Sequence, residues 1–176
     1  MKKTDVPTIP TLAGYEAAEP TGMTKGEVHA LAEQVAAKVG YRPGAELEPI
    51  VSRLGGRIEI HEFAELHETG SIRVDGAGVF TIFLPPYTGR LRDRFTVAHE
   101  LGHYVLHSRF GKNRIRVARE GSGRTEWEAN WFAAAFLMPE KLFRQKIAEG
   151  ASEGALAAFF QVSPAAVQVR REWLEG

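Results

Sequence analysis

The feature that most constrains this chain is a pair of histidines four residues apart, His99 and His103, inside a segment with helical periodicity. Apolar residues recur at the spacing of an α-helix from Thr88 to about His107, so we expect one long helix there. Side chains at this spacing project from nearly the same side of a helix, about one turn apart. The two imidazoles can therefore meet at one metal ion.

Glu100 directly follows the first histidine and completes the pattern His-Glu-x-x-His, or HEXXH. It lies about 100° around the helix, where a carboxylate can reach a metal-bound water without being a primary ligand. Neutral imidazoles bind zinc at about 2.0–2.1 Å, and zinc lowers the pKa of its water towards ~7. The pattern thus predicts a zinc site with His99 and His103 as ligands and Glu100 as general base. The alternative is an amphipathic helix whose histidines merely pack or face solvent.

A third ligand is expected from an acidic residue of a later helix, and Glu126 and Glu128 are both candidates. Thr125 and Glu128 have the spacing of a capping box, in which Glu128 would turn back to the start of its own helix. Glu126 and Asn130 lie one turn apart on the same face, a spacing like the Glu-x-x-x-Asp pair of gluzincins. Asn130 is then predicted to fix His99 by a hydrogen bond. The sequence favours Glu126 and leaves Glu128 open.

Two other residues near the motif are candidates for supporting roles. His107 lies another four residues along, but a straight helix places it ~12 Å along the axis from His99, too far for one zinc ion. It is predicted to support the site from outside the ligands or to lie at the surface. Tyr104 is a candidate to stabilise an oxyanion, and packing on the helix explains it equally well. Three further histidines have no matching spacing and receive no role: His29, His61 and His67.

Composition and charge limit the other classes of function. Lys plus Arg and Asp plus Glu both number 22, so no overall field attracts nucleic acid or an anionic membrane. The chain has no cysteine, which excludes a thiolate metal site and a cysteine nucleophile. Lys2 and Lys3 precede prolines rather than an apolar core, and the longest strongly apolar stretch, 131–138, is far short of the ~20 residues of a membrane span. We expect a cytoplasmic protein that binds neither membrane nor DNA directly.

The remaining pattern predicts an α+β fold. We expect a flexible arm over residues 1–22, a zincin-like metallopeptidase domain over 23–150, and a short helical extension, similar to a helix-turn-helix, packed on it over 151–176. A small mixed sheet of about three strands should pack on the motif helix and on further helices. Strands are predicted at 57–63, 70–74 and 78–84, and helices at 24–39, 47–54, 88–107, 126–138, 139–149, 154–161 and 164–174.

Three local details accompany this fold. Thr24 and Glu27 have the spacing of a capping box at the first helix, and Asp75-Gly76 is a hairpin signal between the second and third strands. The strand at 78–84 is a candidate to bind an extended substrate through its edge, with an ordinary sheet strand as an equal alternative. Residues 108–124 are expected to form a long loop.

Two blocks of sequence closely resemble the ImmA/IrrE family of zinc metallopeptidases. They are Arg94 to His103 with Leu106-His107, and Glu126 to Ala134 with Leu137-Met138-Pro139. The resemblance covers about residues 25–140. It implies a small gluzincin-like domain that binds zinc, with the family's glutamate ligand at Glu126. It also implies a helix-turn-helix transcriptional repressor as the substrate, whose cleavage relieves repression.

Three other functions stay open at this point: a DNA-binding regulator, a metal-binding regulator that does not cut the repressor, and a zinc hydrolase that acts on small molecules. Residues 156–167 look like a helix-turn-helix, and Arg170 and Arg171 offer phosphate contacts on its second helix, so the protein could be a DNA-binding regulator. It could also be a metal-binding regulator that binds the repressor without cutting it. The zero net charge weakens the first alternative and the intact Glu100 argues against the second. The sequence therefore favours a zinc endopeptidase.

Overall fold

A computed structural model of the chain describes residues 14–61, 71–118 and 123–176, and it has an α+β fold, as the sequence predicts. The strands are β1 Gly56–Ile60, β2 Ser71–Gly76, β3 Val79–Leu84 and β4 Arg116–Ala118. The helices are α1 Lys25–Lys38, α2 Glu48–Arg53, α3 Arg90–Gly102, the π-helical turn η1 His103–His107, α4 Arg124–Leu137, α5 Glu140–Ala148, α6 Glu153–Phe160 and α7 Pro164–Glu175. His67, which the sequence left without a role, lies outside the described residues.

The four strands form one sheet in the order β1-β3-β2-β4. β1 runs parallel to β3, and β2 runs antiparallel to both β3 and β4. Since β3 pairs on both sides, its backbone has no open edge, and the prediction that this strand binds a substrate through its edge is wrong. β4 lies within the segment predicted to be a loop. The sequence did not predict it, because a strand of three residues is too short to show an alternating pattern.

The predicted hairpin joins β2 to β3, but its turn lies two residues later than expected. Asp75 and Gly76 still belong to β2, next to an irregularity in the pairing between Val74 and Gly76. The chain reverses at Ala77 and Gly78. Gly78 has a φ of 68°, a left-handed conformation that a glycine adopts at no steric cost. The second of two nearby glycines therefore sets the turn.

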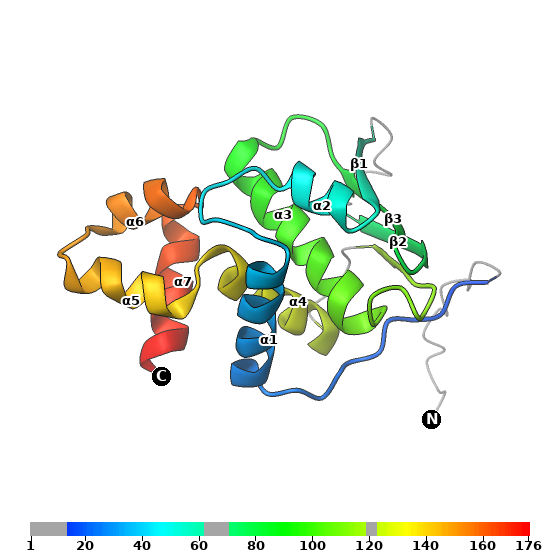
Figure 1. Ribbon diagram of the computed structural model, residues 1–176, viewed down its shortest axis with the longest axis horizontal. Coiled ribbons are helices and arrows are strands. Elements are labelled where there is room, and N and C mark those ends of the chain that lie inside the picture. The colour runs from blue at the N-terminus through cyan, green and yellow to red at the C-terminus, as the bar shows by residue number, and fades with distance from the viewer. Residues whose placement is uncertain (1–13, 62–70, 119–122) are drawn as a thin grey trace, which may run out of the picture.

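Helix α3 runs through the middle of the molecule, with the sheet towards one end and α5, α6 and α7 at the other (Figure 1). It packs against β3 on one side and α4 on another, and α1 packs against α4. Fully buried apolar side chains from these elements form a continuous core: Val28, Ala32, Ile72, Ile82, Ala98, Phe132, Ala133 and Leu137. The motif helix is thus held on several sides, as a site of fixed geometry requires.

The contact between α3 and α4 is unusually close at Gly102. A Cβ atom added there would lie 3.1 Å from the Cα of Ala129 and 3.2 Å from its carbonyl oxygen. Such distances are tighter than nearly all real Cβ contacts, so any larger residue at this position would require the backbone of α4 to shift by a few tenths of an ångström. Gly102 therefore sets the distance between the two helices that carry the candidate ligands.

The segment before α1 contacts the rest of the domain over its described part. The hydroxyl of Tyr15 donates a hydrogen bond to Asp75, and Glu16 forms an isolated parallel bridge with Ile115. Further along, Thr21 donates two hydrogen bonds to Glu128 in α4. Residues 14–22 of the expected flexible arm are therefore bonded to the domain, while residues 1–13 lie outside the described part.

Helix α1 begins with the predicted capping box. The Thr24 hydroxyl accepts a hydrogen bond from the backbone N–H of Glu27 at 3.3 Å, and the Glu27 carboxylate accepts one from the backbone N–H of Thr24 at 2.7 Å. These bonds satisfy two of the donors that a helix start leaves open. This prediction is confirmed.

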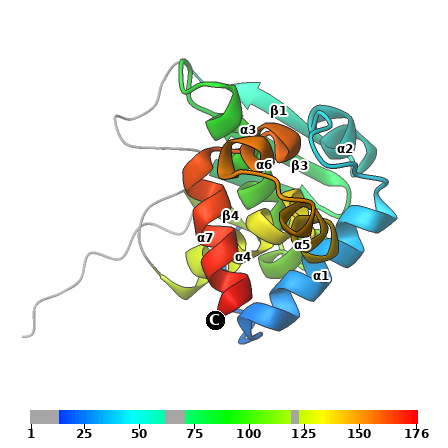
Figure 2. The same cartoon turned by 90° about the vertical axis from the view of Figure 1, so that its left-hand side faces the viewer.

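The C-terminal helices α5, α6 and α7 stand in front of α4 in Figure 2. Arg170 of α7 is fully buried and donates to the carbonyl oxygen of Met138 and to the carboxylate of Glu33, each at 3.0 Å. Its guanidinium also lies 3.2 Å from Nδ1 of His29 in α1. Arg170 therefore joins α7 to α1 and to the end of α4, and it cannot offer the phosphate contact that the DNA-binding alternative assigned to it.

Among the described residues, none of the helices combines the length and the apolar character that crossing a membrane demands.

Candidate metal centre

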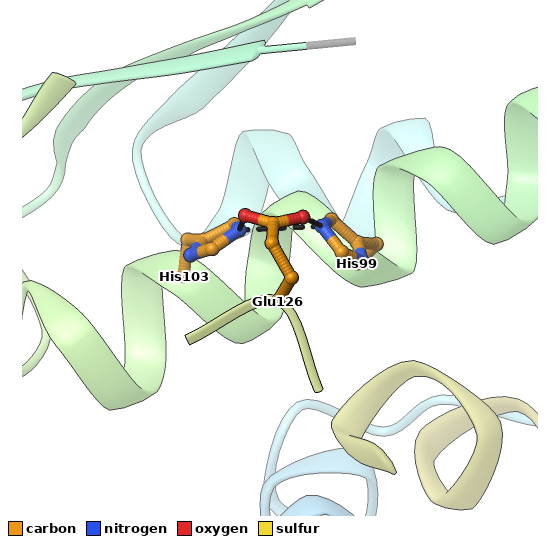
Figure 3. Close-up of side chains that lie close together, drawn as sticks. All are labelled: His99, His103 and Glu126. Atoms are coloured by element: carbon orange, nitrogen blue, oxygen red, sulfur yellow. Dashed lines mark hydrogen bonds and ion pairs between the residues drawn. The ribbon is translucent and has the colours of Figure 1, made fainter. Parts of the chain in front are cut away.

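Three side chains from two neighbouring helices meet at one point (Figure 3). His99 comes from the last turn of α3, His103 opens η1, and Glu126 lies in the first turn of α4. Nε2 of His99 lies 3.1 Å from Oε2 of Glu126, and Nε2 of His103 lies 3.2 Å from Oε1. The two Nε2 atoms are 3.2 Å apart. All three residues are buried, and they are the ligands favoured from the sequence.

The spacing of these donor atoms fits a zinc ion. Zinc in proteins takes four ligands in a tetrahedron, with Zn–N and Zn–O distances of about 2.0–2.2 Å, so neighbouring donors lie roughly 3.3–3.5 Å apart. The separations of 3.1 to 3.2 Å among the two imidazoles and the carboxylate come close to that value. Two imidazoles and one carboxylate are also a donor set found in catalytic zinc sites, which keep the fourth position for water.

The electrostatics of His103 and Glu126 favour the protonation states that a metal needs. Burial lowers the pKa of His103 from 6.5 to about 4, so its imidazole is neutral at neutral pH. Burial raises the pKa of Glu126, but contacts with His103 and His99 outweigh burial and hold that pKa below its ordinary value. Metal ligands bind as neutral imidazoles and ionised carboxylates. His103 and Glu126 therefore already have the charges with which they would bind a cation.

Asn130 lies one turn after Glu126 on α4 and contacts the first histidine. Its Oδ1 is 2.9 Å from Nδ1 of His99, the pair that the sequence predicts. An amide oxygen only accepts, so Nδ1 carries the proton and Nε2 keeps its lone pair towards the other ligands. Asn130 thereby orients the imidazole of His99.

The helix that carries the motif changes its winding at His103, where η1 begins. Such π-helical turns are rare and often lie at functional sites. Nδ1 of His107 lies 2.8 Å from Nδ1 of His103, and its Nε2 lies 3.2 Å from Oε2 of Glu128. His107 therefore stands behind a candidate ligand rather than at the surface.

The capping box predicted between Thr125 and Glu128 does not form, so that prediction is wrong. The N-cap of α4 is Gly123, and the described side chains give this helix no capping bond. The carboxylate of Glu128 instead accepts hydrogen bonds from Thr21 and Arg124 and contacts His107. Burial raises its pKa, but these hydrogen bonds outweigh burial and lower that pKa below the ordinary value. The structure places Glu128 behind the site, away from the cluster of His99, His103 and Glu126.

Tyr104 packs against the hairpin. Its ring stacks on that of Phe80 at 4.1 Å between centroids, and its hydroxyl accepts a hydrogen bond from the backbone N–H of Gly78 at 3.0 Å. The same hydroxyl lies 3.4 Å from the carbonyl oxygen of Phe110. These are the contacts of a packed aromatic, the second of the two explanations that the sequence allowed.

Glu100 is buried, with 1% of its surface exposed, and it follows the candidate ligand His99 directly on α3. A carboxylate at this position in the His-Glu-x-x-His pattern is suited to act as a general base. That role for Glu100 stays a prediction.

A cavity of about 740 Å³ lies one turn from the ligands along the same two helices. Its lining is mostly apolar and comes from α3, α4, α7 and the residue before α7: Leu91, Arg92, Phe95, Thr96, Asn130, Ala134, Ser163, Ala165, Ala166, Val169 and Trp173. Asn130 belongs both to this lining and to the contact with His99. A large apolar space therefore adjoins the candidate metal centre.

Comparison with known proteins identifies the family of this chain. The chain matches the IrrE N-terminal-like domain, a peptidase family, over residues 57–172, which is well over half of its 176 residues. The chain belongs to the IrrE N-terminal-like (ImmA/IrrE) family. The match contains both sequence blocks of the motif and continues through α5, α6 and most of α7.

Two individual proteins illustrate the similarity. Metallopeptidase ImmA of Bacillus subtilis (strain 168) is 31% identical over 72 residues, which are 39% of this chain and 43% of that protein. A Mycobacterium tuberculosis transcriptional regulator of known structure superposes with a TM-score of 0.58 at 18% identity, over 83% of this chain and 46% of that one. The second likeness shows a shared fold. This chain spans less than half the length of either protein.

Three contacts behind the ligands were not predicted from the sequence: those of Glu128 with His107, with Arg124 and with Thr21. Arg124 and Glu128 are four residues apart on one helix, a spacing that favours an ion pair and could have been noticed. Thr21 lies 107 residues before Glu128 in the chain, and no local pattern links them.

Proposed function

We propose that this protein is a zinc-dependent endopeptidase. The observation that carries the proposal is the convergence of His99, His103 and Glu126 at separations that suit one zinc ion, with Glu100 next to the first histidine. Membership of a peptidase family supports the same chemistry. The zinc ion would be held by the two Nε2 atoms and the carboxylate of Glu126.

When bound in such a site, zinc supplies Lewis acidity towards a water molecule and the carbonyl of the scissile peptide. Glu100 acts as general base and takes a proton from the attacking water. It then returns that proton to the nitrogen of the leaving amine, so the carboxylate is regenerated at the end of each turnover. His99 and His103 are each oriented through the Nδ1 atom.

For the substrate, we propose a helix-turn-helix transcriptional repressor, whose cleavage relieves repression. The resemblance of the motif blocks to the ImmA/IrrE peptidases supports this choice. The apolar cavity beside the site offers room for large apolar side chains of a polypeptide. We place the reaction in the cytoplasm, where repressors act. The machinery would lie in residues 23–150, with the helical extension at 151–176 packed on it.

The test is co-expression of the protein with the helix-turn-helix repressor encoded beside its gene, followed by mass spectrometry of repressor fragments. Wild type should produce fragments that end at one defined bond, and Glu100→Gln should leave the repressor intact while it still binds zinc. Glu48→Gln, at an exposed position of α2, is the matched control and should cleave like wild type. Equal cleavage by wild type and Glu100→Gln would refute the mechanism.

A further inference from the structure

A continuous chain of hydrogen-bonding groups runs from the candidate ligand His103 away from the metal centre. Nδ1 of His103 meets Nδ1 of His107 at 2.8 Å, and Nε2 of His107 meets Oε2 of Glu128 at 3.2 Å. The same carboxylate oxygen accepts hydrogen bonds of 2.9 Å from both the backbone N–H and the hydroxyl of Thr21. Its other oxygen accepts from Nε of Arg124 at 3.0 Å. Elements far apart in the sequence therefore meet behind one ligand.

The direction of every hydrogen bond in this chain follows from its two ends. The carboxylate of Glu128 already accepts hydrogen bonds from the backbone N–H of Thr21 and from Nε of Arg124. It is therefore also the acceptor towards His107, whose Nε2 donates. A neutral His107 then accepts at Nδ1, and His103 must donate from its own Nδ1. This leaves the lone pair of His103 on Nε2, the atom that faces Glu126. A metal at Nε2 demands the same tautomer, so both ends of the chain agree.

Because these side chains are buried, each depends on the hydrogen-bond partner that the protein provides. The exposed fraction is 0% for His103 and Glu128 and 3% for His107. Bulk water has little access to replace a missing partner, and an ionised carboxylate is buried at low cost only when its oxygens are hydrogen-bonded. Thr21 and Arg124 supply those bonds from two sides. The N-terminal segment is thereby part of the support of the metal centre.

We propose that Glu128 is a positioning residue that acts through His107 to fix the tautomer and orientation of His103, and that Thr21 holds Glu128 in place. The proposal rests on the metal centre of the proposed function. Outer partners of this kind orient a ligand imidazole and increase its basicity, and their loss typically costs about 10–100-fold in metal affinity. In this protein the support reaches His103 through two side chains in succession, Glu128 and His107.

The experiment measures zinc affinity of the full chain by competition with a chromophoric chelator, together with the visible spectrum of the cobalt-substituted protein. Glu128→Gln keeps the shape of the side chain, and His107→Phe keeps an aromatic ring. Each should weaken zinc binding about 10–100-fold and alter the cobalt spectrum. Thr21→Val, which removes one donor and leaves the backbone N–H, should weaken zinc binding by a smaller factor. Glu48→Gln on α2 is the control and should match wild type.

The double variant Glu128→Gln/His107→Phe tests whether Glu128 acts on His103 through His107, which we call a relay, or whether the two residues act independently. If Glu128 acts through His107, adding Glu128→Gln to His107→Phe causes little further loss of zinc affinity. Losses that simply multiply would overturn the relay, and so would a wild-type affinity and cobalt spectrum in single variants whose denaturant unfolding shows a folded protein. A wild-type protein that binds no zinc would instead refute the metal centre itself.

Discussion

A histidine that binds a metal through Nε2 carries its proton on Nδ1, and an acceptor for that proton fixes the tautomer and orients the ring. The structure meets this need in two different ways, with the side-chain amide of Asn130 for His99 and a second imidazole for His103. The acceptor of His99 comes from the same helix as Glu126, one turn later. A single helix therefore provides both a ligand and the group that orients another ligand.

Asn130 offers a direct test of this orientation. Asn130→Leu removes the acceptor of the His99 Nδ1 proton at nearly constant size, and we expect zinc affinity to fall about 10–100-fold. Asn130→Asp keeps an acceptor oxygen and adds charge, so its zinc affinity should stay at or above that of wild type. Zinc competition measured on both variants checks the prediction. Equal losses in the two would mean that the position matters only for packing.

Much of the candidate site at this scale could be predicted from the sequence, because its logic is local. The spacing of His99 and His103 and that of Glu126 and Asn130 each follow from one turn of a helix. The sequence offered His107 as a supporting residue, but the roles of Glu128 and Thr21 behind it could not be predicted, since they depend on a π-helical turn and on a contact from a distant segment. Tertiary contacts of that kind leave no periodic signal in the sequence.

At the scale of helices and strands, the site depends on how closely α3 and α4 approach. His99 lies on α3 and Glu126 on α4, so the distance between the two helices sets the distance between the ligands. Gly102 permits that approach, because its missing Cβ leaves space for the backbone of Ala129. The sequence predicted both helices, but it could not predict where they touch.

Gly102→Ala should therefore affect both stability and metal binding. The added methyl group forces α3 and α4 apart, so we expect a loss of roughly 1–3 kcal/mol in the free energy of unfolding, with weaker zinc binding. Gly26→Ala, in the first turn of α1 where no atom lies within 4 Å of the new Cβ, is the matched control. It should be neutral or slightly stabilising, since alanine favours a helix. Urea unfolding and zinc competition measure both quantities, and a Gly102→Ala protein as stable as the control would contradict this account.

At the scale of the whole molecule, a polar cluster around the buried Arg170 joins α7 to α1 and to the end of α4. Arg170 in α7 contacts Glu33 and His29 in α1 and the carbonyl oxygen of Met138 at the end of α4. The family match covers residues 57–172, so it includes Arg170 and Met138 but not His29 and Glu33 of α1. The sequence presented Arg170 as a surface residue of a helix-turn-helix, because helical spacing alone does not reveal which face is covered by α1.

The same cluster predicts how stability depends on pH. Burial lowers the pKa of His29 from 6.5 to about 4, with further lowering by Arg170 and Lys25 and an opposing contribution from Glu140. Between those two pH values the unfolded chain binds a proton at His29 that the folded chain does not, so the folded state loses stability as the pH falls. We expect His29 to contribute a loss on the order of 1–2 kcal/mol in the free energy of unfolding between pH 7 and pH 5.

Urea unfolding of wild type and His29→Gln at both pH values isolates this contribution, because glutamine retains an acceptor for Arg170 and does not titrate. The variant should lose less stability than wild type over that interval, and an equal loss in both proteins would show that His29 is not the responsible group.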